Sequence, residues 1–154
     1  MRRGIGKPAT VDDLLRVLDE TEKLGLVHNC DNVLNDPTYI CHCCGCCCHV
    51  LVSINDHGKY ATHPSNFIPQ VEAETCVGCG TCADKCHIRA ITMHEDGNGT
   101  EVPVVKKEAC IGCGVCASGC PAGALTMSRR SVLYVPPNDA QDKFVRIAKG
   151  KGRM

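Results

Sequence analysis

Fifteen cysteines, most of them gathered in three runs, constrain this 154-residue chain more than any other feature. The chain has no Trp, two Phe and three Tyr, so its large side chains are too few to fill an ordinary core. We therefore expect the cysteines to hold part of the fold together. Their odd number and clustered spacing, without a secretory signal at residues 1–10, favour metal binding in a reducing cytoplasm over a disulfide framework.

Two of the runs form an internal repeat. CVGCGTCADKCHIRAITM begins at Cys76 and CIGCGVCASGCPAGALTM at Cys110, and ten of their 18 positions are identical, so they are copies of one unit. Each copy has the spacing C-x2-C-x2-C-x3-C. Three such cysteines wrap one corner of a cubane [4Fe–4S] cluster, and the fourth, too distant along the chain, ligates the other cluster. Zinc commonly uses two separate C-x2-C pairs, which is a different pattern.

Residues 71–135 resemble the bacterial two-cluster ferredoxins, and this resemblance implies an α+β, ferredoxin-like dicluster unit with crosswise ligands. The implied ligands are Cys76, Cys79, Cys82 and Cys120 for cluster I, and Cys110, Cys113, Cys116 and Cys86 for cluster II. Cys120 is followed by the usual proline, Pro121, whereas Cys86 is followed by His87. We expect His87 to face solvent; the alternative is a hydrogen bond or charge that tunes cluster II.

The third run, CHCCGCCCHV from residue 41, has six cysteines in eight residues. Residues i and i+2 of an extended chain share a face, so two of the thiols can bind one cluster from a short strand. Gly45 then permits a turn that returns two later thiols to the same cluster. The predicted ligands of this third [4Fe–4S] cluster are Cys41, Cys43, Cys47 and Cys48, and the predicted spare thiols are Cys30, Cys44 and Cys46.

Three other interpretations of this run stay open. It could be a thiol-rich zinc or copper loop, because soft thiolates suit both ions. It could hold redox-active thiols, because vicinal cysteine pairs oxidise. It could also bind a non-cubane or larger cluster through more than four ligands. A third [4Fe–4S] cluster is favoured because a chain that carries two such clusters already receives that cofactor.

The chain divides into three predicted parts: an irregular, mostly helical and loop-like cluster-binding extension (1–70), the dicluster unit (71–135) and a basic tail (136–154) with a short helical piece. After a basic arm at residues 1–9, a helix is predicted from the N-cap Thr10 to a stop at Gly25. Its apolar stripe should pack against the rest of the protein. The stripe consists of Val11, Leu14, Leu15 and Leu18.

Less regular structure is predicted elsewhere. Residues 26–40 are rich in turn formers, and residues 63–69 with two prolines look like a linker. Inside the dicluster unit, the turn at residues 96–99 predicts a hairpin, and SVLYV at residues 131–135 reads as a strand.

The N-terminal part has a resemblance of its own. GLVHN, ICHCCGCCC and PSNFI, followed by a dicluster unit, are similar to the iron–sulfur electron-transfer subunits of anaerobic oxidoreductases. The small subunit of the tungsten-dependent class II benzoyl-coenzyme A reductases is one such subunit. The resemblance implies a subunit that relays single electrons through three [4Fe–4S] clusters to or from a larger catalytic oxidoreductase subunit, which contains tungsten or flavin.

Other functional classes fit less well. The alternatives are a small enzyme whose N-terminal cluster has an open iron site and a free-standing polyferredoxin; four thiolate ligands on that cluster would favour the relay. The sequence has neither the G-x-G-x-x-G fingerprint of dinucleotide-binding proteins nor the P-loop of nucleotide-binding proteins. Seventeen basic residues balance 17 acidic ones, and each oxidised cluster adds about −2, which argues against nucleic-acid binding. No apolar run predicts a membrane span.

Overall fold

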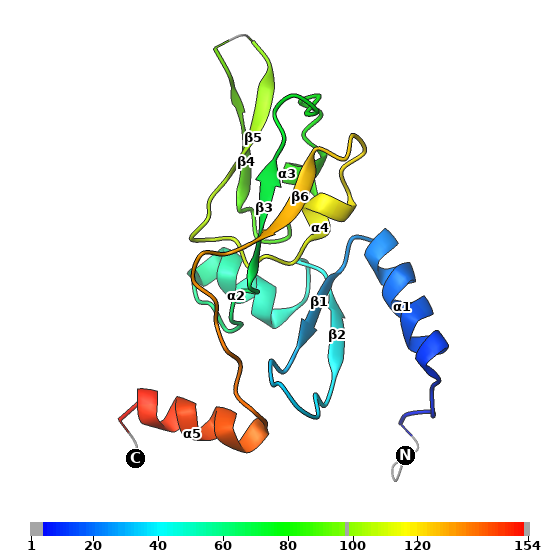
Figure 1. The fold of residues 1–154 in the computed structure, drawn as a ribbon, viewed down its shortest axis with the longest axis vertical. Coiled ribbons are helices and arrows are strands. Elements are labelled where there is room, and N and C mark those ends of the chain that lie inside the picture. Colours follow the sequence, from blue (N-terminus) through cyan, green and yellow to red (C-terminus); the bar gives the residue numbers. More distant parts are fainter. Residues whose placement is uncertain (1–4, 98, 153–154) are drawn as a thin grey trace.

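A computed structural model describes residues 5–97 and 99–152 (Figure 1). The predictions for residues 1–4, Asn98 and Arg153 lie outside these ranges. The helices are α1 (Val11–Lys23), α2 (His49–His57), α3 (Thr81–Asp84), α4 (Val115–Ser118) and α5 (Ala140–Gly150). The strands are β1 (Val27–Cys30), β2 (Ile40–Cys43), β3 (Phe67–Val71), β4 (Ile91–Glu95), β5 (Glu101–Val105) and β6 (Leu125–Arg129). The described chain is thus a mixed α+β protein, as predicted.

The strands pair in twos, and each pair is antiparallel. Strands β4 and β5 form the predicted hairpin. Strand β3 pairs with β6, so the predicted linker at residues 63–69 in fact ends in a strand. Pro69 is tolerated there because β3 has a free edge in its two-stranded sheet. The strand predicted at residues 131–135 is wrong: the pairing strand is β6, and residues 131–135 run on as irregular chain.

The N-terminal extension is more ordered than its turn-rich sequence predicts. Strands β1 and β2 form a second hairpin, in which Val27 opposes Cys43 and Asn29 opposes Cys41. The chain then turns into α2, which ends at Gly58 in the left-handed conformation that glycine favours. Figure 1 shows α2 between this hairpin and the ferredoxin-like unit.

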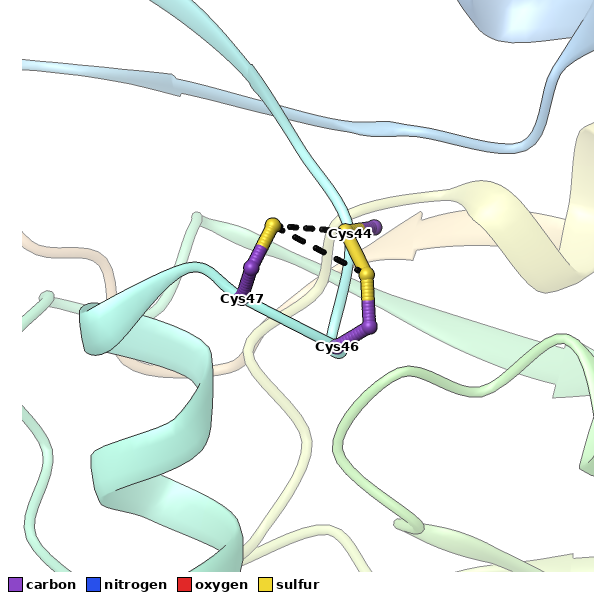
Figure 2. A group of neighbouring side chains, drawn as sticks. All are labelled: Cys44, Cys46 and Cys47. Atoms are coloured by element: carbon purple, nitrogen blue, oxygen red, sulfur yellow. Dashed lines mark hydrogen bonds between the residues drawn. A yellow bond between two sulfur atoms is a disulfide. The ribbon is translucent and has the colours of Figure 1, made fainter.

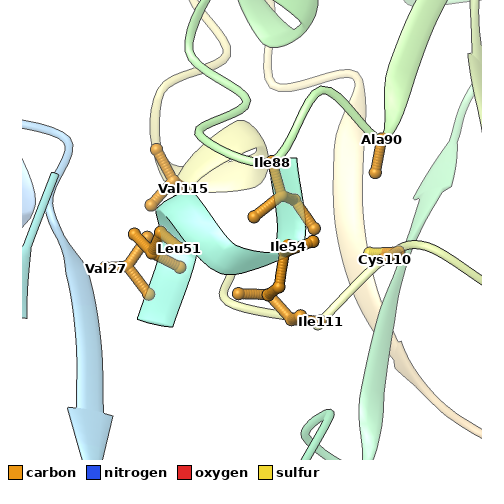
Figure 3. Close-up of a cluster of buried hydrophobic side chains, with 8 residues drawn as sticks. All are labelled: Val27, Leu51, Ile54, Ile88, Ala90, Cys110, Ile111 and Val115. Carbon is orange, nitrogen blue, oxygen red and sulfur yellow. The ribbon is translucent and has the colours of Figure 1, made fainter. Parts of the chain in front are cut away.

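Two small apolar cores hold these parts together. The first surrounds α2, whose Leu51 is fully buried against Val27 of β1 and Val115 of α4 (Figure 3). Its other members are Ile54, Ile88, Ala90, Cys110 and Ile111. The second core lies within the ferredoxin-like unit and consists of Cys82, Ile91, Cys116 and Leu125. Thus α2 joins the extension to the dicluster unit.

Helix α1 begins where the sequence predicts. Thr10 and Asp13 form a capping box, and Gly25 follows the helix with a positive φ of 71°. The predicted packing of its stripe is wrong, because α1 has no buried residue: Val11 is 71% exposed and Leu14 57%. The predicted helix in the tail is confirmed as α5, which also has no buried residue. No helix in the described ranges is long and apolar enough to cross a membrane.

Replacing Leu51 should destabilise the junction around α2. We expect Leu51→Ala to lower the free energy of unfolding by about 2–5 kcal/mol, because it leaves a cavity where three elements meet. The control is Leu24→Ala, since Leu24 is 73% exposed and its change should stay within about 0.5 kcal/mol. Denaturant unfolding under anaerobic conditions measures both; equal effects would contradict the packing role of Leu51.

Candidate functional site

The two copies of the cysteine repeat fold in the same way. In each copy the cysteine loop leads into a four-residue helix, α3 or α4, that starts after a glycine with positive φ. The loops also lie close to neighbouring backbone. A Cβ on Gly112 would collide with the Phe67 carbonyl oxygen and the Ser65 hydroxyl, and one on Gly78 would lie 2.6 Å from the Glu101 carbonyl oxygen. The starts of β3 and β5 therefore hold the two loops in place.

The four cysteines predicted for cluster I meet in one pocket. They are Cys76, Cys79, Cys82 and Cys120. Met93 of β4 and Leu125 of β6 complete its apolar walls. The Cys79 sulfur lies 3.3 Å from the Thr81 hydroxyl, which lowers the pKa of this exposed thiol. Burial raises the pKa of Cys82, the most enclosed thiol of the set. Three cysteines of the first copy thus converge with the last cysteine of the second.

The four cysteines predicted for cluster II also interact. Burial, and then the neighbouring thiols of the same set, raise the pKa of Cys116 to about 12. Backbone N–H groups point at two sulfurs: Ala90 donates to Cys86 Sγ at 3.2 Å and Gly112 donates to Cys110 Sγ at 3.4 Å. Such N–H donors are the usual partners of cluster sulfurs. The donors and their surroundings therefore fit a [4Fe–4S] cluster.

The burial of these thiols has a chemical consequence. A buried thiol is held protonated by the low local polarity, whereas a metal ligand must be a thiolate. Iron in the site supplies the positive charge that favours the thiolate, so binding of the cluster releases protons and stabilises the fold. The raised pKa values of Cys82, Cys110 and Cys116 are what a set of ligands without its metal should have.

His87 does not face solvent, contrary to the prediction. Its Nε2 donates to the Gly25 carbonyl at 2.7 Å, and its Nδ1 accepts from the Gly45 N–H at 3.1 Å. The His87 carbonyl accepts from Asn55 Nδ2 at 2.8 Å. The residue after Cys86 therefore ties the dicluster unit to the N-terminal extension. The break in the Cys-Pro pattern was the sequence signal of this role.

The six-cysteine run divides into two groups of thiols. Cys44, Cys46 and Cys47 lie together in the turn before α2 (Figure 2). A disulfide joins Cys44 to Cys46, and the Cys47 sulfur lies 3.4 Å from Cys44 Sγ and 3.8 Å from Cys46 Sγ. The disulfide spans only Gly45, so it links no distant segments. This group contains Cys47, which was predicted as a ligand of the third cluster.

The other thiols of the N-terminal part face a different space. Cys41 and Cys43 of β2 and Cys48 at the start of α2 line one cavity, and Cys30 of β1 also lines it. Burial, and then Cys48, raise the pKa of Cys43. Burial acts to raise the pKa of Cys48 as well, but the N–H groups at the start of α2 and the Cys43 thiol lower it overall. The structure thus brings three of the four predicted ligands together without Cys47, and adds Cys30.

Two comparisons with known proteins agree with this geometry. Residues 75–124 match the family model described as the 4Fe-4S dicluster domain. Over 34 residues the chain is 38% identical to a "Probable ferredoxin" of Methanosarcina thermophila, a stretch that makes up 22% of this chain and 59% of that protein. Residues 75–124 are therefore similar to ferredoxin-type domains that hold two [4Fe–4S] clusters and transfer electrons. The assignment of individual cysteines to each cluster stays a prediction.

Replacing the fourth cysteine of each copy tests the crosswise ligands. We expect Cys86→Ala to damage cluster II, and Cys120→Ala, the matched variant, to damage cluster I, because each of these thiols lies among the cysteines of the other copy. EPR spectra of the reduced variants measure which cluster signal is lost. Loss of cluster I in Cys86→Ala would contradict the assignment.

Proposed function

We propose that this protein is the iron–sulfur subunit of an anaerobic oxidoreductase and relays single electrons through three [4Fe–4S] clusters to or from a larger catalytic subunit. When bound, such clusters accept and release one electron at a time. The chain's own contribution is to hold the thiols, to exclude water from them and to set their hydrogen bonds. The first two clusters belong to the dicluster domain, and the third is assigned to the N-terminal extension.

The continuous packing of thiols through the two cores is the observation that supports a relay. Cys43 and Cys48 of the extension pack against the first core, which also includes Cys110 and contacts Cys86. Cys86 contacts the second core as well, where Cys120 also packs. The thiols of the extension therefore pack against the same core as Cys86 and Cys110 of cluster II, and cysteines of clusters I and II share the second core. We propose this order for the relay, with cluster II in the middle.

Exposed apolar side chains on both terminal helices support a partner subunit. On α1, Val11, Leu14 and Leu15 are all more than half exposed. On α5, Phe144 is 67% exposed and Ile147 45%. Single exposed apolar residues are ordinary, but a row of them along a helix is typical of a surface that binds another protein. The similarity of the N-terminal segment to anaerobic electron-transfer subunits leads us to propose a partner with tungsten or flavin.

The alternatives differ in what the extension should contain. An enzyme with an open iron site needs a cavity with only three thiols, but four cysteines line the N-terminal cavity. This number favours a fully ligated relay cluster. A free-standing polyferredoxin would use the same thiols but would leave the apolar rows of α1 and α5 without a function.

Iron analysis tests the number of clusters. Full-length protein purified without oxygen should contain about 12 Fe and 12 sulfide per chain, because three four-iron clusters are bound. Zinc is measured in the same sample as the control for a zinc-binding extension. A reproducible value of about 8 Fe would contradict the third cluster and leave the dicluster domain intact.

Co-purification tests the partner. Tagged protein isolated anaerobically from its native host should bring down a larger oxidoreductase subunit, and Leu14→Glu should abolish this by placing a charge in the apolar row of α1. Glu20→Lys, on an exposed position of the same helix, is the matched control. Both variants should keep the iron content of the wild type. Retention of the large subunit by Leu14→Glu would contradict docking through α1.

A further inference from the structure

A cavity of about 330 Å³ lies between the β1–β2 hairpin, the start of α2 and α5. His63 and Tyr134 form one of its walls, with their rings stacked 3.7 Å apart. The eight-atom core of a [4Fe–4S] cluster fits in such a space. The cavity lies outside the dicluster domain.

The cavity presents thiols from three elements. Cys41 and Cys43 lie on one face of β2, because alternate residues of a strand share a face. Cys48 comes from the start of α2, after the turn at Gly45. Cys30 comes from the end of β1, just before the chain turns at Asp31. Cys30 pairs with Ile40 and so lies on the other face of the hairpin from Cys41 and Cys43, but it borders the cavity at the end of β1. The four thiols, which come from three elements, match in number the ligands that a [4Fe–4S] cluster needs.

Two residues of the cavity carry buried polar atoms that have no hydrogen-bond partner in the described ranges. They are Asn29 Nδ2 and Asp31 Oδ1. Asn29 pairs with Cys41 across the sheet, so its amide belongs to the same face as Cys41 and Cys43. Buried donors are normally satisfied, and an amide N–H beside cysteine ligands is suited to a cluster sulfur. The Asn29 side chain lies close enough to the Cys43 thiol to act toward lowering its pKa, so its amide is placed to donate to a cysteine ligand or to a sulfur of the cluster.

Helix α5 forms one side of the cavity and brings positive charge to it. The backbone N–H groups of Leu34 and Asn35 donate to the carbonyls of Pro137 and Asn138, which ties the segment before α5 to the hairpin loop. Lys143 Nζ then donates to the Asp31 carbonyl at 2.9 Å.

The charges at the cavity favour an anionic ligand. Lys143 and Arg146 both line it, as does Asp31. The hydrogen bonds from Thr38 and, more weakly, the charge of Lys143 lower the pKa of the Asp31 carboxylate. Arg146 also pairs with Asp142 on its own helix at 2.8 Å. A cluster with four thiolates carries about −2, so these two cations are suited to it.

The three remaining cysteines of the extension do not line the cavity. Cys44, Cys46 and Cys47 gather in the turn before α2, where Cys46 and Cys47 are exposed. The seven N-terminal cysteines therefore form one group of four that lines the cavity and one group of three in the turn before α2.

We propose that Cys30, Cys41, Cys43 and Cys48 are the ligands of the third [4Fe–4S] cluster, which occupies the cavity under α5. This inference rests on the third cluster of the proposed function, and it replaces Cys47 of the sequence-based set with Cys30. Lys143 acts as a positioning residue that offsets the charge of the cluster.

Single alanine variants of the full-length protein test the ligand set. Cys30→Ala, Cys41→Ala, Cys43→Ala and Cys48→Ala should each lower the iron content from about 12 to about 8 per chain. Cys44→Ala, Cys46→Ala and Cys47→Ala are the matched controls and should stay at about 12. The EPR signals of the two dicluster-domain clusters, retained in every variant, show that the protein has folded.

The outcomes separate this inference from the proposed function. A wild type with about 12 Fe, whose iron is lost in Cys47→Ala but not in Cys30→Ala, would overturn the ligand set and leave the relay intact. A wild type with about 8 Fe would overturn both.

A redox titration tests the role of α5. Lys143→Met should lower the reduction potential of the third cluster, because a nearby cation favours the reduced, more negative state. Lys149→Met, on the same helix but away from the cavity, should leave that potential unchanged. An equal potential in both variants would overturn the role of Lys143 as the positioning residue.

Discussion

Burial of cysteine thiols is the constraint on which the rest of this structure depends. Three of the thirteen buried apolar residues in the described ranges are cysteines of the repeat. Leu51 and Val27 are the largest side chains that are fully buried. Without metal, the core therefore contains protonated thiols in place of larger apolar groups. Folding and cluster binding are coupled for this reason, because iron both satisfies the thiols and links the segments that carry them.

The junction between the extension and the dicluster domain depends on His87. A proline at this position, as in the second copy, could not bind the backbones of Gly25 and Gly45 together. Gly45 also has to be small, because a Cβ there would lie 2.7 Å from the His87 carbonyl oxygen. The close approach places the six-cysteine run beside Cys86. This protein differs from a simple ferredoxin in its N-terminal extension and in having His87 where the second copy has a proline. The two differences belong together, because His87 is the residue that binds the extension.

Sequence patterns predicted the local features well where short-range chemistry dominates. The N-cap at Thr10, the β4–β5 hairpin and the short helix in the tail each depend on residues a few positions apart. Predictions that needed distant partners were weaker. The strand at residues 131–135 is wrong because β3 pairs with β6 instead. The packing of α1 is wrong because amphipathicity requires a partner surface but does not say whether it belongs to the same chain.

The spacing of the repeat was sufficient to predict a dicluster domain, because a cubane cluster admits few arrangements of four thiols on one chain. The six-cysteine run was different. Its thiols are so close in sequence that their spacing does not distinguish ligands from spare cysteines. The conformation of the turn at Gly45 decides which of the later thiols point toward a cluster. Folding separates them, because the β1–β2 pairing, the start of α2 and the docking of α5 place four thiols along one cavity and leave three in the turn before α2. Cys30 belongs to the first group because β1 pairs with β2, and no motif around Cys30 in the sequence predicts this pairing.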